Sequence, residues 1–91
     1  MTSSKLRSPE ELGILQDEVR KGVGSDTLLR TLGPILETRL ESLLIALDQA
    51  PADLAILLDL RAKISCLRIL KKELAQAVQV GREASQALDR N

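Results

Sequence analysis

The stretch that decides the fold runs from residue 54 to residue 80 and reads LAILLDLRAKISCLRILKKELAQAVQV. Apolar side chains recur in it at alternating steps of three and four residues, which is the spacing of a coiled-coil seam. No proline follows residue 51, and only one glycine does. The pattern therefore predicts one long helix from about residue 53 to residue 88. Its seam consists of Leu57, Leu60, Ile64, Leu67, Lys71, Leu74, Val78, Gly81, Ser85 and Leu88.

A short break precedes this long helix. Pro51 cannot continue a helix, and Asp53 can accept hydrogen bonds from the free N–H groups that begin the next one. Upstream of the break lies the clearest amphipathic segment of the chain, which predicts a helix from about residue 34 to residue 49. Because the connecting loop is short, we expect the two helices to run antiparallel. The apolar face of the earlier helix consists of Leu36, Leu40, Leu43, Leu44 and Leu47.

A further helix is expected near the N-terminus. Ser8 can cap it, Pro9 suits its first position, and Glu11 completes a capping box. Gly22–Gly24 is expected to end it. Gly33–Pro34 should kink the next helical stretch or make it restart, because proline lacks an N–H and disfavours helix at the preceding residue. The sequence therefore predicts an all-α protein: an antiparallel helical hairpin with a long C-terminal helix plus a short N-terminal helix, a three-helix arrangement with coiled-coil-like packing.

The 91 residues are enough for one domain with a thin core. Residues 1–7 are polar and are expected to form a flexible tail, which leaves residues 8–91 as a single helical domain. The last part of that domain, from Gly81 onward, offers only small side chains and one leucine for packing. We expect this end of the long helix to fray unless a partner holds it.

The unequal lengths of the predicted helices indicate an interaction surface. A helix over residues 53–88 would be about 50 Å long, whereas a helix over residues 34–49 covers about half of it. The apolar side chains of the overhang must be covered by the N-terminal helix, by another chain, or by both. A monomeric three-helix bundle, a homo-oligomer and docking on a larger assembly all remain open. The predicted protein interface comprises Leu57, Leu60, Ile64, Leu67, Leu70, Leu74 and Val78.

Basic side chains form a second candidate surface on the same helix. Arg61, Arg68 and Lys72 fall close together in helical projection, with Lys71 beside them. Such a stripe could contact an acidic protein or nucleic acid, or it could be an ordinary solvated face. The balance of 13 basic and 13 acidic residues and the absence of aromatic side chains argue against nucleic acid. Lys71 falls at a seam position, and we favour a local shift of the seam onto Leu70.

The composition argues against an enzyme. Histidine is absent, so neither a Ser-His-Asp nor a Cys-His system can be assembled within the chain. Glu37 and Glu41 share a helical face, but no acidic pair matches them on the next helix, so a solvated face is the favoured interpretation. Cys66 is the single cysteine, which excludes an intramolecular disulfide and a cysteine-based zinc site. We expect no cofactor, no metal and no small-molecule substrate.

Two segments of the chain resemble a known class of proteins. They read LESLLIALDQAPADL over residues 40–54 and LRAKISCLRIL over residues 60–70. Their layout is similar to that of small helical-hairpin proteins from the structural modules of tailed bacteriophages. The resemblance implies a many-copy virion or assembly component, and it assigns a role to no individual residue.

Location and function are expected to follow from these features. The N-terminus has no apolar run after its positive charges, and charges interrupt every window long enough to span a bilayer. We therefore expect a cytoplasmic or virion protein with no signal peptide and no membrane span. The leading hypothesis is a non-enzymatic structural or adaptor protein that self-associates or docks on a larger protein assembly through a leucine-rich helix face. The alternative is a small regulatory or inhibitory protein whose basic stripe binds an acidic protein or nucleic acid.

Overall fold

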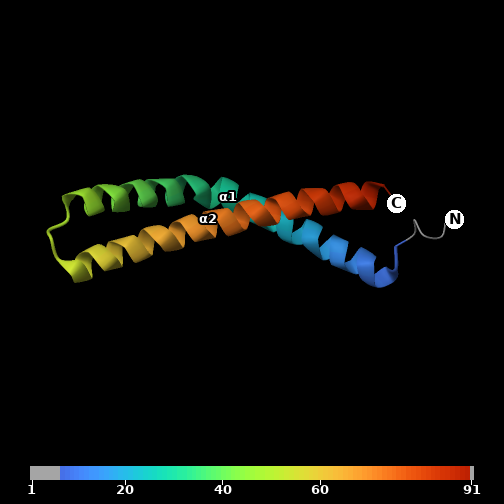
Figure 1. Cartoon of the computed structure of the whole chain (residues 1–91). Coiled ribbons are helices and arrows are strands. Elements are labelled where there is room, and N and C mark those ends of the chain that lie inside the picture. Colours follow the sequence, from blue (N-terminus) through green and yellow to red (C-terminus); the bar gives the residue numbers. More distant parts are fainter. Residues whose placement is uncertain (1–6, 91) are drawn as a thin grey trace.

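Two helices make up the part of the chain that the computed structural model describes, residues 7–90. Helix α1 spans Pro9–Gln49 and helix α2 spans Leu54–Asp89, and the two run antiparallel as one hairpin (Figure 1). The hairpin measures 67 × 24 × 15 Å and has a radius of gyration of 19.6 Å. A compact domain of this length would have a radius of gyration of about 12 Å. The predicted all-α hairpin is confirmed, and it is long and thin.

Both helices begin where the sequence predicts. The Ser8 side chain accepts a hydrogen bond from the Glu11 N–H at 3.1 Å. The Asp53 carboxylate accepts hydrogen bonds from the N–H groups of Ala55 at 2.9 Å and Ile56 at 3.2 Å. These N–H groups have no carbonyl partner within their own helix, so the two caps stabilise the first turns.

The predicted short N-terminal helix does not end at Gly22–Gly24, because α1 continues to Gln49. Gly22 is buried against Gly81 of α2, and a Cβ atom added to Gly22 would lie only 2.8 Å from the Cα of Gly81. The glycine therefore permits a close approach of two helix backbones rather than ending a helix. This tertiary contact outweighs the roughly 1 kcal/mol by which glycine disfavours a helix interior. Residues 7–90 form two helices where the sequence predicted three.

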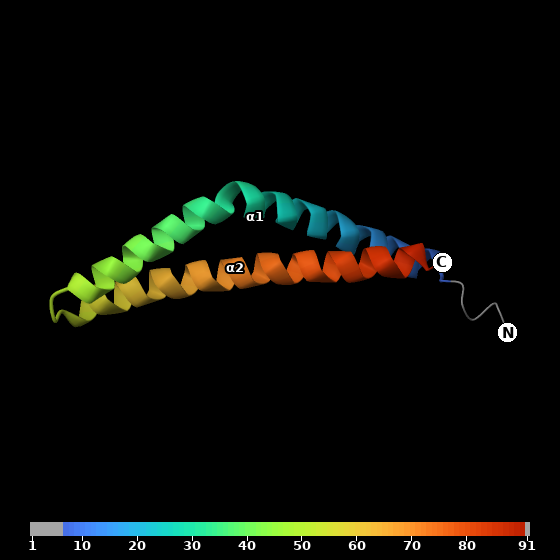
Figure 2. The ribbon, with the colours of Figure 1, turned by 90° about the horizontal axis from the view of Figure 1, so that it is seen from above.

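Of the kink and the restart predicted at Gly33–Pro34, the structure shows the kink, as a bend inside α1. Figure 2 shows α1 bending where its ribbon turns from teal to green, the part that contains this pair. Pro34 has no N–H for the Arg30 carbonyl, and its ring crowds that carbonyl, which kinks the helix. The helix continues because Gly33 has no Cβ to clash with the proline ring. The Thr38 hydroxyl also donates a hydrogen bond to the Pro34 carbonyl at 2.9 Å.

One heptad seam joins the two helices along their whole length. On α2, the buried and half-buried positions follow the predicted seam from Leu57 to Gly81. On α1, the same alternating steps run without interruption through both Gly22 and Gly33. The antiparallel register follows from the contact between the two buried glycines. The α1 seam consists of Leu12, Leu15, Val19, Gly22, Asp26, Leu29, Gly33, Leu36, Leu40, Leu43 and Leu47.

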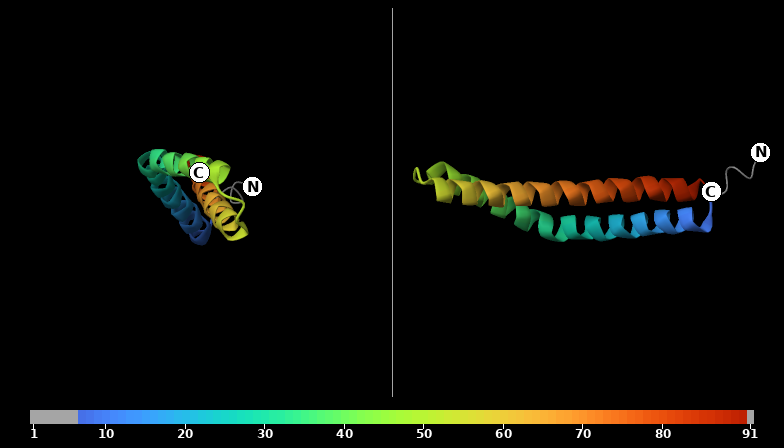
Figure 3. Two further views of the ribbon diagram at one scale, coloured as in Figure 1. Left: turned by 90° about the vertical axis from the view of Figure 1, so that its left-hand side faces the viewer. Right: turned by 60° about the horizontal axis from the view of Figure 1, so that its bottom comes forward.

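The overhang predicted for the long helix does not exist, since α1 has 41 residues and α2 has 36. The end of α2 lies alongside the beginning of α1 (Figure 3). Gly81 and Ala84 are buried there, and α2 continues to Asp89, so the small side chains predicted to pack weakly instead let the helices come close. Residues 1–6 of the predicted tail, and Asn91, lie outside the described residues. Neither helix contains a segment long and apolar enough to cross a membrane.

Candidate protein-interaction surface

The residues predicted as a protein interface lie mostly inside the hairpin. Ile64 and Val78 are buried, and four others are half-buried. Helix α1 is the element that covers them, because the described chain contains no other element besides α2 itself. Leu70 alone is exposed. The unbroken α1 therefore occupies the surface that a shorter helix would have left to another chain. The half-buried residues are Leu57, Leu60, Leu67 and Leu74.

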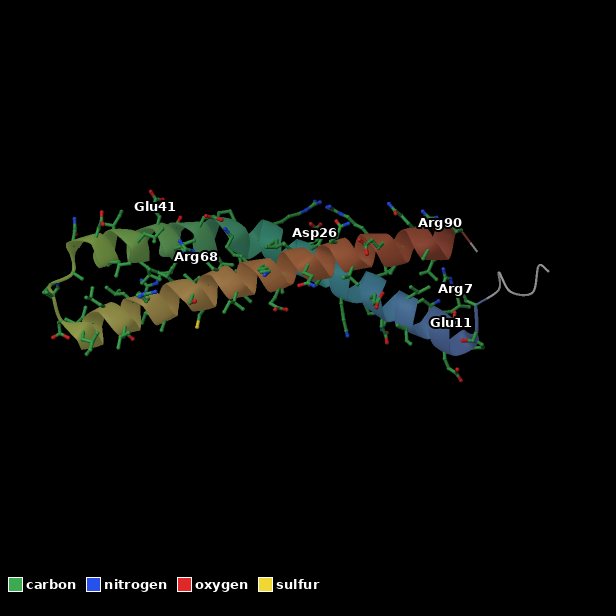
Figure 4. The ribbon with its side chains drawn as sticks, viewed as in Figure 1. Arg7, Glu11, Asp26, Glu41, Arg68 and Arg90 are labelled. Atoms are coloured by element: carbon green, nitrogen blue, oxygen red, sulfur yellow. The ribbon has the colours of Figure 1, made fainter. Side chains whose placement is uncertain are left out.

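The structure brings two residues of the predicted basic stripe together in one groove. Arg61 and Arg68 are exposed, and they line a shallow groove of about 170 Å³ with Leu44 and Leu47 of α1. Figure 4 shows Arg68 in the space between the two ribbons. Lys72 is also exposed. Three of the four predicted basic residues are thus available to a charged partner.

Lys71, the fourth, belongs to the seam. It is half-buried, and its ammonium group forms an ion pair with the Glu37 carboxylate of α1. This is the one ion pair that joins α1 to α2 within residues 7–90. In the heptad register Lys71 lies opposite Gly33, where a Cβ atom added to the glycine would have no other atom within 4 Å. The predicted shift of the seam onto Leu70 is wrong, because Leu70 is the more exposed of the two residues.

The two carboxylates considered for acid–base or metal chemistry do not work together. Glu37 pairs with Lys71, whereas Glu41 points away from α2 (Figure 4). Within residues 7–90, no three His, Cys, Asp or Glu side chains gather as metal ligands would. Cys66 is an exposed free thiol. The prominent chemistry of the described surface is that of apolar and charged side chains.

Two open flanks border the seam, one on each side. In a heptad whose seam positions are a and d, positions b and e lie on one side and positions c and g on the other. The b and e side includes Arg61, Arg68 and Lys72, and we call it the charged flank. The c and g side carries six of the exposed large apolar side chains and the b and e side carries four, so we call the c and g side the apolar flank. Its apolar members in the middle of the hairpin are Leu28, Leu32, Ile35, Cys66 and Leu70.

The middle of the apolar flank is a cluster of large side chains that α1 and α2 leave exposed. Leu28, Leu32 and Ile35 of α1 are 46%, 40% and 62% exposed, and Leu70 of α2 is 44% exposed. The three α1 residues are spaced four and three apart, so they are neighbours on one helix face. In the register, Leu70 lies across from Leu32. We call these four residues the central patch. Isolated exposed leucines are ordinary, but a contiguous group of them indicates a contact surface.

Two shallow grooves on the apolar flank are lined by both helices, and one lies on each side of the central patch. We call them the loop-side groove and the terminal-side groove. The rim of the first is basic and the rim of the second is mainly acidic. The loop-side groove, of about 360 Å³, is lined by Arg39, Lys63, Leu43, Ala62, Cys66 and Leu67. The terminal-side groove, of about 320 Å³, is lined by Glu18, Glu73, Lys21, Gln76, Ala77 and Val80.

Sequence reasoning included Leu70 in the predicted interface but missed the three α1 members of the central patch, although their spacing is visible. Leu28, Leu32 and Ile35 recur at steps of four and three beside the seam. A helix break at Gly33–Pro34 would divide them between two elements. They form a surface only because α1 continues through the bend.

Comparisons of the chain with models of protein families, with curated proteins and with solved structures found no match.

Proposed function

We propose that this chain is a non-enzymatic structural or adaptor protein that binds other protein chains through its apolar flank. The observation that carries the proposal is the exposure of four large apolar side chains, the central patch, beside the seam that joins α1 to α2. Burying a Leu or Ile side chain completely contributes about 1.5–3 kcal/mol. Because the four are each about half exposed, a partner that covers them gains roughly 4 kcal/mol from this patch alone.

The shape of the hairpin supports the same proposal. Within the described residues, the buried apolar side chains are only Leu43, Ile64, Val78 and Ala84. Two helices in one layer enclose little volume, and a second layer packed on the apolar flank would convert the hairpin into a bundle with an interior. Self-association and docking on a larger assembly both provide that layer. A many-copy virion component, which the resemblance to phage hairpin proteins implies, is one such assembly.

Paired substitutions on the two flanks test this proposal. We expect Leu32→Ser with Leu70→Ser to abolish association, because the central patch becomes polar. Leu58→Ser is the matched control, since Leu58 is 56% exposed but lies on the charged flank. Light scattering measures self-association, and co-purification with the native assembly measures docking. A wild-type chain that stays monomeric and binds no protein in a patch-dependent way contradicts the proposal.

A regulatory role through the charged flank is the second candidate. The observation that favours it is the shared groove of Arg61 and Arg68, with Lys72 exposed on the same side of α2. Lys71 contributes less, because Glu37 already pairs with it. Binding to an acidic protein or to nucleic acid should weaken in Arg61→Ala with Arg68→Ala and should fall as salt is raised. Partner binding that is indifferent to ionic strength excludes this role.

A further inference from the structure

We propose that the partner of the central patch is a second copy of this chain, which packs antiparallel on the same flank to form a four-helix bundle. The two-fold axis would pass between Leu32 and Leu70. This inference rests on the proposed function and names the occupant of the surface that the function requires. Three properties of the apolar flank carry it: the symmetry of its grooves, the signs of their charges and its area.

The central patch lies midway between the two grooves. On α2, Lys63 of the loop-side groove and Ala77 of the terminal-side groove are each one heptad from Leu70. On α1, Leu43 and Lys21 line the two grooves at equal distances from Leu32, about three turns on either side. A two-fold rotation at the patch therefore brings the loop-side groove of one copy onto the terminal-side groove of the other. An isologous dimer requires a surface that is complementary to itself in this way.

The charges of the two grooves favour the antiparallel arrangement. Arg39 and Lys63 are the charged residues that line the loop-side groove, and Lys63 already forms an ion pair with Asp59 at 2.8 Å, so Arg39 supplies most of the positive charge there. Glu18 and Glu73 outnumber Lys21 in the terminal-side groove. Antiparallel packing brings the basic rim of each copy to the acidic rim of the other, twice per dimer. Parallel packing would bring basic rim to basic rim and acidic rim to acidic rim. Electrostatic complementarity of this kind selects orientation more than it adds affinity.

The flank is large enough for a stable dimer. With a length of 67 Å and a width of at least 15 Å, one face of the hairpin offers a projected area of about 1000 Å². A standard protein–protein interface buries roughly 800 Å² on each partner. The apolar centre with charged groups on either side also matches the usual anatomy of an interface, a desolvated core with a polar rim.

Patch variants in the full chain test whether the partner is a second copy. Analytical ultracentrifugation over a range of concentrations gives the mass and the dimer dissociation constant. We expect a dimer for the wild type, and a dissociation constant raised at least 100-fold in Leu32→Glu with Leu70→Glu, because carboxylates would be buried in an apolar contact. Leu58→Glu should leave it unchanged, and circular dichroism confirms that each variant remains helical. A wild-type monomer at every concentration overturns the proposal, as does a dimer that the patch variant leaves intact.

Two charge reversals test the antiparallel orientation. Arg39→Glu and Glu73→Arg each turn two attractive cross-copy pairs into repulsive ones, which should weaken the homodimer by roughly fivefold or more. An equimolar mixture of the two variants restores both pairs in a heterodimer, so association should recover. A dissociation constant of the mixture that returns toward the wild-type value supports antiparallel packing. A dissociation constant no lower than those of the separate variants overturns it.

The same experiments separate this inference from the proposed function. If the wild type is monomeric but a different protein binds it and is lost in the Leu32 and Leu70 variant, the second-copy inference fails and the proposed function stands. If the variant changes neither self-association nor the binding of any other protein, both fail.

Discussion

The loop half and the terminal half of the hairpin share one heptad seam but pack it differently. In the loop half, large side chains such as Leu43 and Ile64 are buried between the helices. In the terminal half, Gly22 and Gly81 meet backbone to backbone, and Val78 and Ala84 are buried nearby. Large side chains keep two helices apart and fill the space between them. Glycines let the two helix backbones come into contact, and this packing is possible only because neither glycine has a Cβ atom. The loop half should therefore lose stability when a buried side chain is made smaller, and the contact between the two glycines in the terminal half should lose stability when a side chain is made larger.

The largest expected effect is in the loop half. Leu43→Ala should lower the free energy of unfolding by about 3 kcal/mol, because it removes transfer energy and leaves a cavity in the seam. Urea unfolding followed by circular dichroism measures this change, at one fixed protein concentration because self-association would shift the midpoint. Ile45→Ala, at an exposed position of the same helix, should change stability far less. Equal losses in both variants would mean that the loop half is not held by its seam.

In the terminal half, we expect added volume to destabilise the hairpin. Gly22→Ala places a Cβ against the backbone of Gly81 and should lower the free energy of unfolding by about 2 kcal/mol, in spite of the better helix propensity of alanine. Gly24→Ala is the matched control, because no atom lies within 4 Å of its added Cβ. That substitution should raise the free energy of unfolding by about 1 kcal/mol. The same urea titration measures both, and stabilisation by both substitutions would contradict the close helix contact.

The difference between the halves also explains how much of the fold could be predicted from the sequence. The caps at Ser8 and Asp53, the helix from residue 54 onward and the hairpin itself follow from local signals and periodicity. The continuity of α1 could not be predicted from local rules, since Gly22 and Gly33–Pro34 both carry the signature of a helix end. Only the contact with Gly81, a residue distant in the sequence, shows that Gly22 lies inside a helix.

A smaller effect is expected at the boundary between the halves. Lys71→Leu should raise the free energy of unfolding by about 1 kcal/mol, because a lysine at an inner seam position lowers stability in exchange for specificity. The loss of its ion pair with Glu37 offsets only a small part, since the Glu37 side chain is 59% exposed. Differential scanning calorimetry would detect the higher melting temperature. A lower melting temperature would show that the ion pair outweighs the apolar contact.

The smallest effect concerns surface charge. Arg30→Gln removes the ion pair between the Arg30 guanidinium and the Asp26 carboxylate, 3.0 Å apart in the terminal half. We expect a loss of about 0.5 kcal/mol or less in the free energy of unfolding, and a still smaller loss in high salt. Urea titrations at two salt concentrations would measure it. A loss as large as that of Gly22→Ala would mean that charge, rather than the close backbone contact, holds this half together.

The candidate site was harder to predict than the fold for a related reason. The leucines of α2 were correctly placed on one face, but a sequence pattern does not say which helix covers that face. Once α1 is continuous, it covers residues such as Ile64 and Val78 itself. The surface left over is the apolar flank, whose members Leu32 and Leu70 come from different helices and lie across from each other only in the antiparallel register.

The bend at Pro34 divides α1 into two units for hydrogen exchange. One backbone hydrogen bond of the helix is missing there, because Pro34 has no N–H. A local opening of the helix that begins before Pro34 therefore need not spread to the residues after it. The segment after Pro34 packs through Leu43, and the segment before it packs through Gly22. Amide protection should therefore fall into two blocks along α1, with separate opening free energies, while α2 exchanges as a continuous rod.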